Sequence, residues 1–251
     1  IFIGDEIAVS GSASVASNIM IGTAAGNLLA GSNSNIGIGA NALGNYDNSG
    51  DTTEPNICIG ENSGYNLASG HGNIAIGHET LNSAQTGERN VAIGHEAGKT
   101  LSSASNNVFL GYKAGTLATS INNTLIGSQA GIALTTGVGN TALGYNALST
   151  EDTGAKNVAI GYEALTALNY NGNGHNVAIG YEAGHDVNTG IKNTFVGGIA
   201  GSKVTTGGSN VLMGYSAGGA ITEGQRNIAI GADALATSTT TSYNVAVGHG
   251  A

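Results

Sequence analysis

The chain has 251 residues, of which 43 are glycine, and it contains one proline, one cysteine and no tryptophan. Glycine at this level without a Gly-X-Y period excludes collagen, and a single cysteine excludes an internal disulfide framework. Charged residues make up only 9% and the formal net charge is −9, which argues against nucleic acid or an anionic membrane as a partner.

A short word recurs along the chain: Asn, a β-branched residue, a small or apolar residue, an aliphatic residue and Gly. Most copies lie 17 residues apart. Self-similarity at a short fixed period is the signature of a solenoid, so we predict one all-β domain over residues 1–251, a parallel β-solenoid of about 15 coils. Residues 1–4 are a copy without its Asn, and the others begin at Asn18, Asn35, Asn56, Asn73, Asn90, Asn107, Asn123, Asn140, Asn157, Asn176, Asn193, Asn210, Asn227 and Asn244.

Each coil is expected to contain two short strands and two corners. The three residues between Asn and Gly predict the first strand. After the Gly come two variable residues, a small residue and then Gly or Leu, which predict a second, weaker strand. Helix is the competing interpretation of Ala-rich words such as residues 163–168, but frequent interior Gly is costly in a helix.

The first strand is apolar on both faces, because side chains alternate along a strand and all three positions are apolar in most copies. We expect one face to line the coil and the face of the middle residue to pack on neighbouring subunits, since an exposed apolar ladder of this length is rare in monomers. The predicted subunit-interface residues are Ala75, Ala92, Ala142, Ala159, Ala178 and Ala229. Cys58 replaces this Ala in one copy, and we interpret it as a small buried residue.

Stacked coils bring equivalent residues to about 4.8 Å from each other. Asn side chains at that spacing form ladders that stabilise stacked strands, and the Gly that ends every strand suits a corner with positive φ. The predicted structural ladder is represented by Asn73, Asn90, Asn157, Asn176 and Asn227, with Gly77, Gly94, Gly161, Gly180 and Gly231.

The period lengthens at two places, both at the corner before the Asn. Copies are 21 residues apart from Asn35 to Asn56 and 19 apart from Asn157 to Asn176, and the copy from Asn107 is one residue short. Insertions in repeat proteins often lie on a binding face, although tolerated loop drift is the favoured alternative. Candidate binding residues in the expanded corners are Tyr46, Asp47, Asp51, Tyr170 and His175.

A tyrosine row follows the corner Gly, and it forms the second group of candidate binding residues. Aromatic rows can stack on apolar sugar faces, but Tyr at this place can equally cover the edge of the coil with its hydroxyl in water. The row consists of Tyr112, Tyr145, Tyr162, Tyr181 and Tyr215.

Catalytic motifs are absent from the sequence, which has no phosphate loop, no Cys-x-x-Cys and no Gly-x-Ser-x-Gly. Solenoid acyltransferases have a hexapeptide period that does not divide 17, and a carbohydrate-degrading solenoid needs carboxylates clustered in a groove. We therefore expect no enzyme activity and no cofactor. His78 with His95 and Glu79 with Glu96 recur in consecutive coils; such a ladder can bind a divalent ion, but a solvated, screened edge is the better interpretation, so we assign no metal site.

The word at residues 157–165, Asn-Val-Ala-Ile-Gly-Tyr-Glu-Ala-Leu, resembles the head repeats of trimeric autotransporter adhesins. With the 17-residue period, the similar word at 140–148 and the Thr-Gly corners, it looks even more like repeats of bacteriophage tail fibres. The resemblance covers nearly all of the chain. It implies a left-handed parallel β-roll and a homotrimer around the long axis.

These observations predict a segment of an extracellular, cell-surface or virion-surface fibre that is structural and adhesive. The expected partners are copies of the chain itself and a cell-surface receptor, glycan or matrix, with no nucleic acid and no membrane insertion. The chain opens and closes inside repeats, so we expect a fragment of a longer fibre. The alternative is a purely structural extracellular filament that polymerises end to end, because open sheet ends invite pairing.

Overall fold

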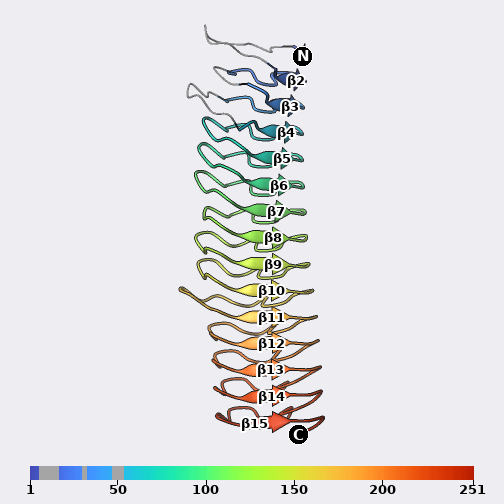
Figure 1. The fold of residues 1–251 in the computed structure, drawn as a ribbon, viewed down its shortest axis with the longest axis vertical. Coiled ribbons are helices and arrows are strands. Elements are labelled where there is room, and N and C mark those ends of the chain that lie inside the picture. Colours follow the sequence, from blue (N-terminus) through green and yellow to red (C-terminus); the bar gives the residue numbers. More distant parts are fainter. Residues whose placement is uncertain (6–16, 30–32, 47–53) are drawn as a thin grey trace. The chain divides into compact units, whose positions relative to one another are not determined.

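The structure is a computed structural model that describes residues 1–5, 17–29, 33–46 and 54–251 (Figure 1). It divides into two compact units, residues 1–123 and 124–251. All regular structure in the described residues is short β-strand. None of the described segments is a helix that could cross a membrane.

The first unit contains one sheet in which each strand pairs in parallel with the next one in the sequence. Equivalent repeat positions face each other: Ile57 pairs with Ile74 and Cys58 with Ala75. Its strands are β1 (Phe2–Ile3), β2 (Ile19–Ile21), β3 (Ile36–Ile38), β4 (Ile57–Ile59), β5 (Ile74–Ile76), β6 (Val91–Ile93) and β7 (Val108–Leu110).

The second unit repeats this arrangement, again in sequence order and fully parallel. Figure 1 shows the strands of each unit stacked one after another. The predicted parallel β-solenoid with a 17-residue period is therefore confirmed in both units. The strands are β8 (Thr124–Ile126), β9 (Thr141–Leu143), β10 (Val158–Ile160), β11 (Val177–Ile179), β12 (Thr194–Val196), β13 (Val211–Met213), β14 (Ile228–Ile230) and β15 (Val245–Val247).

The second strand predicted for each coil is not formed: in the described residues each coil contributes a single strand, and the rest is turns. Positive backbone angles are the reason. In the coil that begins at Asn73, Glu79 has φ 55°, Leu81 has φ 44° and Arg89 has φ 55°, in addition to 135° at the corner Gly77. A residue with positive φ cannot continue an extended strand, so the chain bends several times within one coil.

The predicted subunit-interface alanines lie inside the coil, so that prediction is wrong. Ala75, Ala92, Ala142, Ala159, Ala178 and Ala229 are all 0% exposed within the single chain. The first and third residues of these strands, although larger than the alanine between them, face outward and are half-buried or exposed. Within each unit, we call the surface made by the first and third residues of its three-residue strands the outer strand face.

The core of each coil is small because three columns of side chains share it. In the coil from Asn90 these are Ala92 from the strand, Ala97 after the corner and Leu101 before the next one, all 0% exposed. Because the core is closely packed, a residue larger than alanine fits at the middle of the strand only where another column contributes less volume. Cys58 fits this interior as expected, and burial raises the pKa of its thiol to about 12.

Arginine substitutions on the two faces of β10 test which face of the strand is buried. Ala159→Arg places a charge in the core and is expected to cost more than about 4 kcal/mol of unfolding free energy. Val158→Arg, one residue earlier, points to the outer strand face and should leave the chain folded. Circular dichroism melts of both variants provide the measurement, and a folded Ala159→Arg variant beside an unfolded Val158→Arg variant would contradict the assignment.

Candidate functional site: the asparagine ladder and the surfaces it positions

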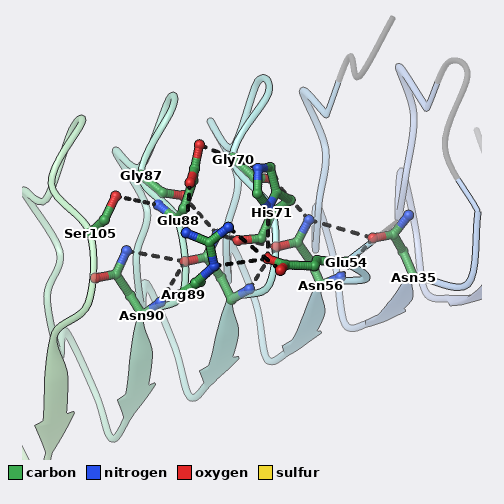
Figure 2. Close-up of polar contacts among 11 residues, drawn as sticks. Asn35, Glu54, Asn56, Gly70, His71, Gly87, Glu88, Arg89, Asn90 and Ser105 are labelled. Atoms are coloured by element: carbon green, nitrogen blue, oxygen red, sulfur yellow. Dashed lines mark hydrogen bonds and ion pairs between the residues drawn. The ribbon is translucent and has the colours of Figure 1, made fainter. Parts of the chain in front are cut away.

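Buried asparagines join each coil to the next. The backbone N–H of Asn73 donates to Oδ1 of Asn56 at 2.9 Å, and Nδ2 of Asn73 donates to the same oxygen at 3.1 Å and to the carbonyl of Gly87 at 2.8 Å. The pattern recurs in the second unit, where Asn193 donates in the same way to Asn176. Figure 2 shows Asn35, Asn56 and Asn90 aligned along one corner. All polar groups of the amide are used, as a buried amide requires.

The corner glycines form a second ladder beside the asparagines. Gly77 has φ 135°, and a Cβ atom built on it would lie 2.8 Å from the carbonyl carbon of Gly94 in the next coil. Both the backbone angle and the close approach of the next coil therefore require glycine. The two ladders fix the register of the strands and, with it, the place of every outward side chain.

An asparagine substitution tests how much the ladder contributes. Asn90 is fully buried and its Oδ1 accepts hydrogen bonds from Asn107, so Asn90→Ala leaves buried donors unpaired and should lower the unfolding free energy by about 2 kcal/mol or more. Asn82→Ala is the control, because Asn82 is half-buried and its side chain donates to the Asn62 carbonyl at a corner; it should cost less than about 1 kcal/mol. Equal losses in denaturant titrations of the two variants would contradict the role of the ladder.

The outer strand face is the main apolar surface that the ladders position. Its residues are β-branched or aliphatic, and none of them is charged in the described strands. Several are more than a third exposed, among them Leu143 at 44%, Met213 at 39% and Ile230 at 40%. An apolar surface repeated on successive rungs is the kind that proteins cover in an assembly.

Three tyrosines of the predicted row form a stack of rings. Tyr162 lies 5.3 Å from Tyr145 and 5.3 Å from Tyr181 between ring centroids, with interplanar angles of 19° and 11°. In the first unit His78, His95 and Tyr112 stack in the same way at 5.1 and 5.5 Å. Rings inside a stack cover one another's faces, so Tyr162 offers no free face to a sugar.

The carboxylates of the suspected metal ladder are paired with lysines. Lys99 Nζ lies 2.6 Å from Glu79 and 2.9 Å from Glu96, and Lys113 Nζ lies 3.4 Å from Glu96. The hydrogen bond from Lys99, followed by its charge and by Lys113, lowers the pKa of Glu96. Among the residues that the structure describes, no three His, Cys, Asp or Glu side chains gather as metal ligands. The edge is therefore an ion-paired surface.

The expanded corners differ from the prediction in one respect. Tyr46 is 1% exposed, so it is a core residue and not a surface-binding one; it takes the core column that Leu29 and Leu67 occupy in the coils on either side. Tyr170 is half-buried and His175 is exposed, as a binding corner would need. Asp47 and Asp51 lie outside the described residues.

Glu54, His71, Glu88 and Arg89 form a polar cluster that the sequence analysis did not select (Figure 2). Nδ1 of His71 lies 3.0 Å from Glu54 and its Nε2 lies 3.3 Å from Glu88, while Nε of Arg89 lies 3.1 Å from Glu54. The hydrogen bond with His71, and then Arg89, lowers the pKa of Glu54. The cluster ties three successive coils together beside the first expanded corner.

Glu151 is a second residue that the sequence analysis missed. It is 0% exposed and takes the core column filled by Leu134 and Leu168 in the neighbouring coils. Its carboxylate accepts hydrogen bonds from the backbone N–H of Gly154 at 2.6 Å and of Tyr170 at 3.4 Å. In regular coils the equivalent N–H, such as that of Gly190, donates to a carbonyl of the next coil. Glu151 replaces that carbonyl where the expanded corner at 169–175 interrupts the pattern.

Glu151 also predicts a pH dependence of stability. Burial raises the pKa of its carboxyl, and the backbone hydrogen bonds only partly oppose the shift. Because the folded-state pKa lies above the unfolded value, the folded chain binds this proton more tightly, and the native protein loses stability as pH rises through the folded-state pKa. Glu151→Gln keeps an acceptor oxygen but does not titrate. The melting temperature of the Glu151→Gln variant, measured relative to that of the native chain, should therefore rise as the pH is raised from about 4 to about 8.

Exposed Glu223 provides the matched control for this measurement. Glu223→Gln removes one carboxylate from a corner without removing a buried one, so its melting temperature relative to native should change little over the same pH range. Parallel pH profiles of the Glu151→Gln and Glu223→Gln variants would contradict the role given to the buried carboxylate.

Comparisons with known proteins identify no family for this chain. A scan against models of protein families and searches of curated proteins and of solved structures found no match to this chain. What the chain does is therefore argued from the geometry above.

Proposed function

We propose that this chain is a structural and adhesive segment of a fibre on a cell or virion surface. It holds exposed corners away from that surface for contact with a receptor, glycan or matrix, and its work is mechanical, not catalytic. It is not inserted in a membrane and does not bind nucleic acid. The finer identity, a left-handed β-roll of the adhesin-head or tail-fibre kind, belongs to this proposal.

The observation that carries the proposal is the uncovered, uncharged outer strand face on successive rungs of both units. Each coil is stabilised mainly by its neighbours in a solenoid, so such a chain can extend without a larger core. A copy of the same chain presents the same ladder of aliphatic side chains at the same strand spacing of about 4.8 Å, and the two ladders match rung by rung.

Charge supports self-association through this face. The chain carries a net charge of −9, yet the charged side chains of the ion pairs described above lie at the corners and none lies on the strands. Copies can therefore bring their outer strand faces together without placing like charges in contact. The resemblance of the repeat to trimeric adhesin heads favours three chains around a common axis.

Sedimentation and electron microscopy test the proposal. We expect a particle of about three times the 24.6 kDa chain mass that appears as discrete short rods. Val158→Arg combined with Ile179→Arg should dissociate it into folded monomers, whereas Glu223→Arg at a corner should leave it assembled. A stable, soluble monomer of the native chain would contradict the proposal, and long unbranched polymers would favour the end-to-end filament.

A further inference from the structure

The expanded corner at 169–175 contains both Asn-Gly pairs of the sequence, Asn171-Gly172 and Asn173-Gly174. In Figure 1 this corner projects between β10 and β11. Glycine has no side chain to shield its backbone nitrogen, so this nitrogen can attack the side-chain amide of the asparagine before it. Because the two pairs have the same residue types and lie in the same corner, a difference in their reactivity must come from the fold.

The second pair is held by the coils on either side. The N–H of Gly174 donates to the Ala155 carbonyl at 2.9 Å, and the Gly174 carbonyl accepts from the N–H of Lys192 at 2.7 Å. Gly174 is buried, and Asn173 forms a parallel β-bridge with Ala155. The nitrogen of Gly174 is therefore engaged, and it can reach the Asn173 side chain only after the corner opens locally.

The first pair is free at the atoms that react. Asn171 is exposed, and among the residues that the structure describes none accepts a hydrogen bond from the N–H of Gly172. The Gly172 carbonyl accepts from the N–H of Ala155 at 2.9 Å, so the pair is anchored on the side away from Asn171. The nitrogen of Gly172 can thus approach the Asn171 amide without breaking a hydrogen bond of its own.

The backbone of the corner also requires glycine at position 172. Gly172 has φ 146°, and a Cβ atom built on it would lie 3.0 Å from Cε1 of Tyr170. Residues with a side chain rarely adopt such a backbone angle. The shape of the corner therefore keeps, after Asn171, the residue type that leaves the attacking nitrogen unshielded.

We propose that Asn171 is a site of spontaneous deamidation. The nitrogen of Gly172 forms a bond to Cγ of Asn171, and the side-chain amide nitrogen leaves as ammonia, with the proton of the Gly172 N–H. Water then opens the resulting succinimide ring at either of its carbonyls, which gives aspartate or isoaspartate at position 171. The net change consumes water and releases ammonia, so neither an oxidant nor a reductant is needed.

Deamidation changes both the charge and the backbone of this corner. It adds a carboxylate to the corner that carries the candidate binding residues Tyr170 and His175. Isoaspartate also routes the backbone through the former side chain, just before Gly172, whose carbonyl joins the corner to Ala155. The corner is thus altered slowly and irreversibly, by a chemistry that does not rest on the proposed fibre function.

Mass spectrometry of the incubated native chain tests the site. Trypsin releases residues 157–192 as one peptide, and fragmentation localises the mass increase caused by replacing NH₂ with OH. At neutral pH we expect Asn171 to react at least about tenfold faster than Asn173, because reaction at Asn173 first requires a local opening. Equal rates, or faster reaction at Asn173, would overturn the proposal.

The unfolded chain is the control for the role of the fold. In concentrated guanidinium chloride the two Asn-Gly pairs lose their structural difference and should react at similar rates. A preference for Asn171 of the same size in the unfolded chain would show that the fold does not cause it, and would also overturn the proposal.

A variant and the identity of the product test the chemical route. Asn171→Gln lengthens the side chain, which disfavours closure to the five-membered ring, and should leave only the slow reaction at Asn173. Undiminished reaction of the peptide from this variant would contradict the assignment to Asn171. Isoaspartate forms only through the succinimide, so a product that contains aspartate alone would contradict attack by the Gly172 nitrogen.

Discussion

The hydrogen bond from one buried asparagine to the next is the interaction on which the rest of this structure depends. Each coil contributes only a three-residue strand, too little to hold a register by itself. The side-chain amide of an asparagine such as Asn73 joins the coil before it, through Asn56, to the corner after it, through Gly87. With both partners in place the amide is satisfied in the interior, and any other register would leave it buried and unpaired, which is costly.

That constraint explains why so much of the fold could be predicted from the sequence. The Asn and Gly positions carry the period, and the period alone indicates stacked parallel strands. The sequence could not show which face of the strand is buried, because both faces are apolar, with Val158 and Ile160 on one and Ala159 on the other. The larger residues suggested the core. The interior side is instead the side of the middle residue, which is alanine in most coils but Phe109 or Phe195 in others, and all of these are fully buried. The positive φ angles of Glu79 and Leu81 were equally hidden, because such residues rarely adopt them.

The candidate sites were predictable only in part, for a related reason. The tyrosine row could be found because its members share one repeat position. Comparing Glu151 with Leu134 and Leu168, which lie at the same distance from their Asn, would have shown a carboxylate in a core column. The same comparison would have placed Tyr46 in the core. The cluster of Glu54, His71 and Arg89 depends on side-chain directions at an expanded corner, which repeat positions do not specify.

Residue-resolved amide hydrogen exchange of the isotope-labelled chain tests the ladder most directly. If coils are joined through buried asparagines, the backbone N–H groups of Asn73, Asn90, Asn193 and Asn210, each of which donates to the asparagine one coil earlier, should be among the slowest to exchange. They should exchange together with the strand amides that follow them. Rapid exchange of these asparagine amides, at the rate of exposed corner residues, in a chain whose strands remain protected would contradict the ladder as the interaction that holds the coils in register.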